Sequence, residues 1–341
     1  MSIKLSLIEL GAIPSDLGNR PLFEDMLQTA ILLEEWGYNR IWYAEHHNTA
    51  NFISRAPEVI IPHIASKTSS IRLGSGSVLL NHYSPFKVAE VFTLLEEMFP
   101  GRIDMGIGRA TTGPVSDLAL QRNRSSLRTS NDSMPQLQEL LSWLNGSFEG
   151  KHVFNDVKSH YGNKLPEFWL LGSSYWSASA AAQLGLNYTY AGFINPEQAY
   201  DNFQIYKDNF KPSTSKVGKD KPNFILSLSI FCADTLEDAG RLAAPYIYMM
   251  NQVYRGNINA PIASEESAVA QLGAIPAQEL INDYKKFPKN LIGTPLSLKK
   301  DIEAIAKVFQ TGEIFIQCIS NNTQNRLRSL KLLSEVFNLK N

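Results

Sequence analysis

The residues best suited to chemistry follow short apolar runs in the first half of the chain. The polar residues at these positions are Glu45, His46, His47 and Asn48, then Gly76, Ser77, Asn81 and His82, then Arg109, and then Ser173, Ser174 and Tyr175. An imidazole can exchange a proton near neutral pH, and a guanidinium offers a fork of donors that suits a phosphate. The pattern therefore indicates acid–base and anion-binding chemistry.

A phosphate site is one interpretation of Arg109 together with Ser173, Ser174 and Ser177. The sequence Gly172-Ser173-Ser174 directly precedes an expected helix, and the first backbone N–H groups of a helix are free to bind an anion. Serines at this position also act simply as helix caps, and Arg109 alone could form a salt bridge with a neighbouring loop. The residues leave both interpretations open.

A metal site is not expected from the histidine pair. Adjacent side chains on a strand point to opposite sides, so His46 and His47 are poorly placed to share one ion. The sequence has no HExxH motif, and Cys232 and Cys318 lie far apart. We expect one histidine to face a pocket and the other to be structural, paired with Glu45.

The elements that must position these residues alternate along the chain. The runs end at residues 44, 76 and 108, which are 32 residues apart, and the next run ends 64 residues later at residue 172. One strand–helix unit occupies about 30 residues, so the last interval contains a long insertion. Residues 111–133 and 145–166 have loop-like compositions and account for it.

Eight strands and eight helices are expected. The strands are 3–8, 41–44, 71–80, 102–108, 166–172, 186–192, 223–233 and 312–319, and the helices are 21–36, 57–65, 86–98, 177–184, 196–210, 235–250, 295–308 and 324–339. A less regular region covers residues 251–290. The alternation predicts an α/β protein, a (β/α)8 TIM barrel with inserted loops that forms one domain over residues 1–341, with a doubly wound sheet as the second choice. In such a barrel the active site lies at the C-terminal ends of the strands, where the polar residues fall.

Composition excludes several classes of partner. The 341 residues include 32 Lys+Arg and 33 Asp+Glu, for a net charge of −1, so neither a nucleic-acid groove nor a polybasic membrane patch is expected. The N-terminus reads as a strand rather than a signal peptide, and no apolar run approaches the ~18 residues of a membrane span. Two isolated cysteines are typical of a reducing cytoplasm, which is the expected location.

Several motifs occur together and in order. They are WYAEHHN (42–48), APEVIIPHIASKTSSIRLGSGSVLL (56–80), SPFKVAEVFTLLEEMFPGRIDMGIGRA (84–110), LLGSSYWSASAAAQLGL (170–186) and LIGTP (291–295). In this combination the sequence resembles the bacterial luciferase-like flavin-dependent monooxygenase superfamily, and within it the oxidoreductases with a single type of chain. The resemblance implies a (β/α)8 barrel that uses reduced FMN and O2 to oxygenate a small organic substrate, a reaction on paired donors that incorporates molecular oxygen.

The resemblance also implies partners. Reduced FMN would come from a separate flavin reductase, because no nicotinamide-binding domain is visible in the sequence. The chain would form a homodimer through the helices near residues 57–66 and 86–98. The substrate would be selected by segments 111–133 and 251–290.

Motif matching carries the family's site residues onto this chain. The resemblance implies that His46 is the catalytic histidine. It implies that Arg109 binds the FMN phosphate together with a turn formed by Ser173, Ser174 and Ser177. It also implies that Gly76 and Ser77 form a non-proline cis peptide against the flavin, and that Glu90 is a carboxylate near the pocket. Light-emitting luciferases carry cysteine at position 108 and glutamate at position 173. This chain has Gly108 and Ser173, so bioluminescence is not expected.

Three alternatives stand beside this hypothesis. The first is a deazaflavin-dependent dehydrogenase on the same fold, which transfers a hydride and does not use O2. The second is a non-catalytic flavin-binding protein, against which the presence of His46 argues. The third is a barrel enzyme of unrelated chemistry, for which every motif at the barrel rim would be a coincidence.

Overall fold

A computed structural model describes residues 3–13, 22–110, 113–121 and 132–340. Its strands are β1 (Lys4–Glu9), β2 (Arg40–Tyr43), β3 (Arg72–Ser75), β4 (Val78–Leu79), β5 (Ile103–Gly108), β6 (Glu167–Gly172), β7 (Asn187–Ala191), β8 (Phe224–Cys232), β9 (Asn290–Gly293) and β10 (Glu313–Gln317). Its helices are α1 (Leu22–Glu35), α2 (Pro57–Ala65), α3 (Pro85–Met98), α4 (Pro114–Leu120), α5 (Ser133–Asn145), α6 (Tyr175–Leu184), α7 (Ala199–Asp208), α8 (Leu236–Tyr254), α9 (Glu265–Leu272), α10 (Pro295–Val308) and α11 (Thr323–Phe337).

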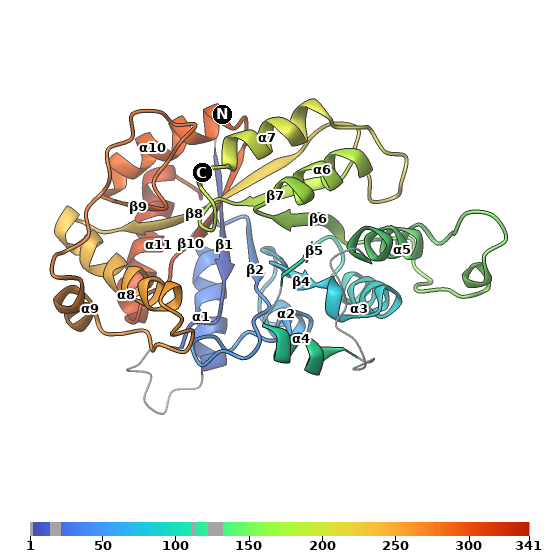
Figure 1. The fold of residues 1–341 in the computed structure, drawn as a ribbon, viewed down its shortest axis with the longest axis horizontal. Coiled ribbons are helices and arrows are strands. Elements are labelled where there is room, and N and C mark those ends of the chain that lie inside the picture. The colour runs from blue at the N-terminus through green and yellow to red at the C-terminus, as the bar shows by residue number, and fades with distance from the viewer. Residues whose placement is uncertain (1–2, 14–21, 111–112, 122–131, 341) are drawn as a thin grey trace.

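The strands form a closed parallel barrel with helices between them (Figure 1). Neighbours follow the order β10-β1-β2-β3-β5-β6-β7-β8, and β8 pairs with β10 to close the ring. All these pairings are parallel. The predicted (β/α)8 barrel is therefore confirmed, because a doubly wound sheet would leave two open edges.

The N-terminal ends of the strands surround a buried ionic network. Arg40, at the start of β2, lies 2.9 Å from Asp104 of β5 and 2.8 Å from Glu313 of β10. Arg72, at the start of β3, also pairs with Asp104. Buried charges are tolerated only where each has a partner, and here the partners come from four different strands. The network therefore fills this end of the barrel and joins its strands.

An aromatic layer lies above the ionic network. Trp42 is two residues beyond Arg40 and thus on the same face of β2. Its ring centre lies 5.6 Å from that of Trp169 and 4.4 Å from that of Phe315, and its indole N–H donates to Asp104 at 2.8 Å. All three rings are fully buried. Side chains therefore fill the half of the barrel interior at the N-terminal ends of the strands. A ligand can bind inside the barrel only at the C-terminal end.

Proline marks the start of several helices. Pro57 and Pro295 are the first residues of α2 and α10, as the sequence predicts, and Pro85 is the first residue of α3, one residue before the expected start. The first helical position needs no N–H partner, and the fixed φ of proline suits it. Pro21, expected to open the first helix, lies outside the described residues.

The third predicted strand is divided in the structure. The expected continuous strand 71–80 forms β3 and β4, and the Gly76–Ser77 peptide bond between them is cis. β3 pairs with β2, while β4 pairs only with β5. The apolar pattern continues through the break, which explains why the sequence alone suggests one strand.

The long insertion contains a helix that loop composition does not predict. Within residues 111–133, α4 occupies Pro114–Leu120 and begins with proline after Gly113, whose φ is 102°. The expected loop is wrong for this part, while residues 111–112 and 122–131 lie outside the described residues. Residues 146–166 are irregular apart from a short 3-10 turn at Val153–Asp156, and they project from the barrel at the right of Figure 1.

The region 251–290 is more ordered than predicted. α8 continues to Tyr254, α9 covers Glu265–Leu272, and β9 begins at Asn290. β9 pairs with the C-terminal half of β8 and lengthens that wall of the barrel. Four residues of strand are too few to produce a clear alternating pattern, so β9 is not visible in the sequence.

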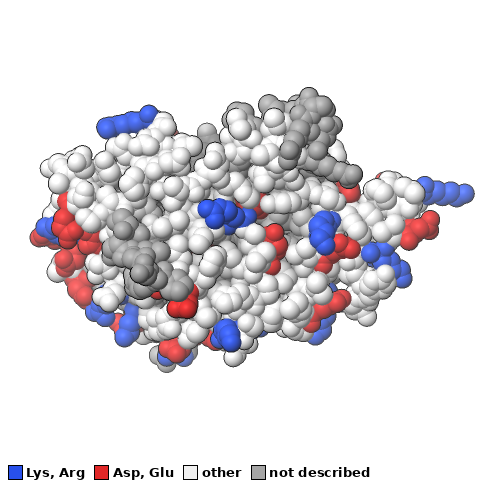
Figure 2. Space-filling view, turned by 90° about the horizontal axis from the view of Figure 1, so that it is seen from below, with Lys and Arg blue, Asp and Glu red and all other residues white. Residues whose placement is uncertain are grey.

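The surface carries charges of both signs. On the face shown in Figure 2, acidic side chains gather at the left edge, while elsewhere positive and negative side chains are interspersed. Among the described helices, none combines the length and apolar character needed to cross a membrane.

Candidate active site

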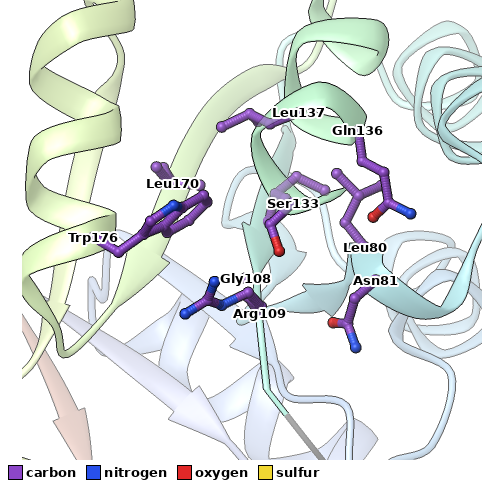
Figure 3. A pocket seen from close by; sticks show the side chains of 10 residues that line it. Leu80, Asn81, Gly108, Arg109, Ser133, Gln136, Leu137, Leu170 and Trp176 are labelled. Carbon is purple, nitrogen blue, oxygen red and sulfur yellow. The ribbon is translucent and has the colours of Figure 1, made fainter. Parts of the chain in front are cut away.

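A small pocket lies beside the C-terminal ends of β5 and β6 (Figure 3). Its walls are Leu80, Asn81, Ile107, Gly108, Arg109, Ser133, Gln136, Leu137, Leu170 and Trp176. The sequence identified Arg109 and Asn81 as residues at the ends of strands. It did not identify Ser133 and Gln136, because both belong to α5 beside the insertion, where no strand end marks them.

Arg109 and the serine turn lie together at this pocket. The guanidinium carbon of Arg109 is 4.7 Å from the ring centre of Trp176, a cation–π distance. Trp176 is the second residue of α6, directly after the turn that contains Ser173 and Ser174. The structure therefore brings Arg109 next to the first turn of α6, as a phosphate site requires.

Ser177 is occupied within the protein. Its side chain is buried, and its hydroxyl donates to the Ser174 carbonyl at 2.8 Å and accepts from the Ser174 N–H at 3.4 Å. Its Oγ also lies 3.0 Å from the hydroxyl of Tyr188 on β7. This is the helix-capping geometry that the sequence left open, and it favours a role in holding the turn.

Gly76 and Gly108 form a glycine surface at the ends of β3 and β5, and both are packed closely against neighbouring side chains. The Gly76 N–H donates to the Tyr43 carbonyl at 2.8 Å, which fixes the start of the cis turn against β2. A Cβ on Gly76 would lie 3.0 Å from the Cβ of Trp42, and a Cβ on Gly108 would overlap the Ser77 hydroxyl. Both positions are therefore closely packed, and a side chain at either one would have to displace Trp42 or Ser77.

His46 lies just beyond β2 with most of its ring buried. The ring packs against Phe52 at 4.9 Å, and its Nδ1 has no hydrogen-bond partner among the described residues. Burial, together with the neighbouring His47, lowers the pKa of His46 to about 4. The imidazole is therefore neutral at physiological pH and can accept or donate one hydrogen bond.

Glu45 connects the other histidine to the cis turn. One carboxylate oxygen of Glu45 lies 2.7 Å from Nε2 of His47 and accepts from the Tyr83 hydroxyl at 2.8 Å. The other oxygen accepts from the backbone N–H of Leu79 in β4 at 3.0 Å. Burial and this carboxylate raise the pKa of Tyr83. The expected pairing of His47 with Glu45 is confirmed, and it holds the residues after β2 against the turn between β3 and β4.

Glu90 does not join these residues, which corrects the expectation that it lies near the pocket. Its carboxylate pairs with Lys87 at 3.2 Å on the surface of α3 and lines a separate surface groove with Glu97 and Tyr161. The reason is helical phase: Ala89 and Phe92 face the barrel, so position 90 turns away from it.

Metal ligands are not gathered anywhere in the described part of the chain. Among the described residues, no group of three or more His, Cys, Asp or Glu side chains is placed to hold an ion. Cys232 and Cys318 are free and buried.

Fold and site together define a (β/α)8 barrel with a ligand site built from the ends of its strands. Residues 4–310 match the family model described as luciferase-like monooxygenase. The chain belongs to the luciferase-like monooxygenase family.

Individual relatives cover almost the whole chain. A protein of Escherichia coli (strain K12) named luciferase-like monooxygenase is 33% identical over 343 residues, which include 98% of this chain and 97% of that protein. Among solved structures, apo-MsnO8 is 32% identical, covers 99% of both chains and has a TM-score of 0.88. The oxygenating constituent of 3,6-diketocamphane monooxygenase from Pseudomonas putida, solved in complex with FMN, is 19% identical with a TM-score of 0.69 and covers 98% of this chain and 97% of its own. At that identity the last comparison shows the fold alone.

Proposed function

We propose that this chain is an FMN-dependent monooxygenase that acts on paired donors, reduced FMN and a small organic substrate, with O2. The observation that carries the proposal is the pocket at the end of β5, where Gly108 and Arg109 meet Trp176 at the start of α6. The family membership supports the oxygenase class, and the FMN complex of the diketocamphane enzyme supports FMN as the cofactor.

The residues present fit FMN. Gly76 and Gly108 present backbone and no side chain of their own at the ends of β3 and β5, with their Cβ positions taken by Trp42 and Ser77, and a flat flavin ring would lie against this backbone. Arg109 would bind the phosphate as a charged donor, and the backbone of Ser173 and Ser174 at the start of α6 would supply N–H groups. Ser177 would hold the turn in place through its cap. Trp176 would keep the Arg109 side chain oriented through their stacking.

The protein's own residues would exclude water and control a proton. Reduced FMN, when bound, supplies the electrons with which O2 is activated for oxygen transfer. His46 is neutral because its pKa is about 4, so its unpartnered Nδ1 can hold or accept a proton at the end of β2. The Phe52 ring against His46 would limit the access of water, and a hydrogen bond from the imidazole to a bound ligand would be stronger for it.

We propose two protein partners for this chain, a separate flavin reductase and a second copy of the same chain. A separate flavin reductase would supply reduced FMN, as the resemblance implies. A homodimer would form through α2 and α3, since Val59, Leu94 and Met98 on these helices are exposed apolar side chains. We also propose that residues 1–341 act as one domain, with one continuous hydrophobic core, and that the free thiols reflect a cytoplasmic location.

Anaerobic titration with photoreduced FMN tests the cofactor. We expect saturable binding of reduced FMN, followed, on rapid mixing with O2, by a transient absorbance that differs from both reduced and oxidised flavin. Binding of a reduced deazaflavin in place of FMN would favour the dehydrogenase. Tight FMN binding without the transient would favour a flavin-binding protein that does not turn over, and binding of neither cofactor would overturn the proposal.

A further inference from the structure

A second set of side chains faces the glycine surface from across the barrel. In the ring of eight strands, β3 lies opposite β8, and β5 lies opposite β10. Gly76 follows β3, and Gly108 is the last residue of β5. Side chains that point inward from the C-terminal ends of β8 and β10 therefore face the two glycines across the mouth of the barrel.

Strand register shows which side chains these are. Gln317 ends β10 and points inward, because Phe315, two residues earlier on the same face, stacks on Trp42 inside the barrel. Ser229 of β8 is the direct partner of Gln317, and Asn290 of β9 is the direct partner of Ser229. Ser227 lies two residues before Ser229 on the same face. We call Ser227, Ser229, Asn290 and Gln317 the polar wall.

Each member of the polar wall has a buried polar atom that needs a partner. The hydroxyls of Ser227 and Ser229, Oδ1 of Asn290 and Oε1 of Gln317 make no hydrogen bond to any residue that the structure describes. The three barrel-strand members are almost completely buried. The side chain of Gln317 shares a hydrogen bond with Tyr246, which helps to fix its amide. Buried polar atoms in proteins usually have partners, so four neighbouring exceptions along the inner face of β8, β9 and β10 point to a ligand.

The chemistry of the wall defines the group that it can bind. Serine hydroxyls donate and accept, while the carbonyl oxygens of Asn290 and Gln317 accept from an N–H or O–H. None of the four side chains carries a charge. A carboxylate or an ammonium group placed here would lose its hydration without gaining an opposite charge, whereas a neutral amide would satisfy donors and acceptors together.

We propose that the polar wall binds the substrate through a neutral hydrogen-bonding group of the amide type. This inference rests on the proposed function, since it places the substrate opposite the glycine surface on which the flavin would lie. His46 follows β2, which lies next to β3 in the ring, so the substrate would sit between the wall and the residues at the glycine surface. The wall is then a specificity-determining surface that contacts substrate and not flavin.

Three probes of equal chain length test the preference: hexanamide, hexanoate and hexylamine. Calorimetric titration of the full-length protein, with and without oxidised FMN, should show the tightest binding for hexanamide. Ser229→Ala and Gln317→Met should each weaken hexanamide binding about 5-fold, as expected for one lost hydrogen bond, and change FMN affinity less than about 2-fold. The matched controls are Ser179→Ala and Gln183→Leu, on α6 outside the barrel, which should change neither.

Amide binding by the polar wall and FMN binding by the chain are tested by different results. Hexanoate or hexylamine binding as tightly as hexanamide to the wild-type protein would overturn the inference, as would unchanged hexanamide binding in both wall variants. Loss of FMN affinity in these variants would also overturn it, because the wall would then hold the flavin. Absence of FMN binding by the wild-type protein would instead contradict the proposed function, while the probe preference is still measured in the flavin-free protein.

Discussion

Ser77 fills the space that a side chain at Gly108 would need. A Cβ built on Gly108 would overlap the Ser77 hydroxyl and lie 3.0 Å from the Ser77 Cβ. The sizes of Ser77 and Gly108 are thus complementary: the serine side chain occupies the space that the glycine leaves. The cysteine that light-emitting luciferases carry at this position would not fit here without a change at Ser77.

Gly108→Ala should therefore destabilise the protein and weaken FMN binding. Overpacking of this kind costs about 1–3 kcal/mol in the free energy of unfolding. Chemical denaturation and FMN titration measure the two effects. The double variant Ser77→Gly with Gly108→Ala should recover most of the lost stability, because it removes the overlapping hydroxyl. Equal stability of the single and double variants would show that the two positions are not coupled.

Arg109→Ala should weaken binding of reduced FMN by about 10- to 100-fold. A charge-assisted contact to a phosphate contributes about 1.5–3 kcal/mol, which corresponds to that range. Arg109→Lys should fall in between, since it keeps the charge and loses the fork of donors. Arg241→Ala, which removes an exposed arginine from α8, is the control. Unchanged FMN affinity in Arg109→Ala would remove this residue from the site.

His46 should make the protein less stable in acid. Its pKa is about 4 in the folded state and 6.5 in the reference state, so between these values the unfolded chain binds more protons and the free energy of unfolding falls as the pH is lowered. The full difference is on the order of 3 kcal/mol. His46→Gln should flatten this part of the stability profile between pH 6.5 and 4. His63→Gln, an exposed position on α2, should leave the profile unchanged.

Asp104→Asn should destabilise the fold without reaching the site. The carboxylate accepts from Arg40, Arg72 and Trp42, so neutralising it leaves buried arginine charge partly unpaired. Breaking such a network costs about 3–5 kcal/mol. Thermal or denaturant unfolding measures the loss, with the exposed Asp208→Asn at the end of α7 as control. FMN affinity of the remaining folded protein should stay within about 2-fold of wild type, because the network lies at the opposite end of the barrel.

Glu90→Gln should leave FMN binding unchanged. The carboxylate is on the outside of α3 and pairs only with Lys87 in the part of the chain that is described. An exposed pair of this kind contributes about 0–1 kcal/mol, so stability should change little. A loss of FMN affinity comparable to that of Arg109→Ala would restore Glu90 to the site and contradict its observed position.

Local pattern predicts much of the barrel because its strands are buried on both faces and its helices have one apolar face. Pro57 and Pro295 open helices where expected, and the spacing of 32 residues between strand ends reflects real strand–helix units. The residues at strand ends, such as Arg109 and Asn81, could be identified because a parallel barrel brings all such ends to one rim.

Features that depend on distant residues could not be predicted in this way. Ser133 reaches the pocket through the packing of α5, and Glu90 points away from it through helical phase. The polar wall depends on the register between β8, β9 and β10, which are separated by long stretches of chain. In the sequence, a serine or glutamine within an apolar strand only interrupts the hydrophobic pattern. Its place in a shared polar surface becomes visible only when the neighbouring strands are known.

The fixed charges inside the barrel lie at the end away from the candidate site. Arg40, Arg72, Asp104 and Glu313 satisfy one another there, while the wall opposite the glycines is neutral. Replacement of one neutral residue by another on that wall would leave every one of these ion pairs in place. Substitutions on this wall can therefore change what the chain recognises without disturbing the ion pairs that join its strands.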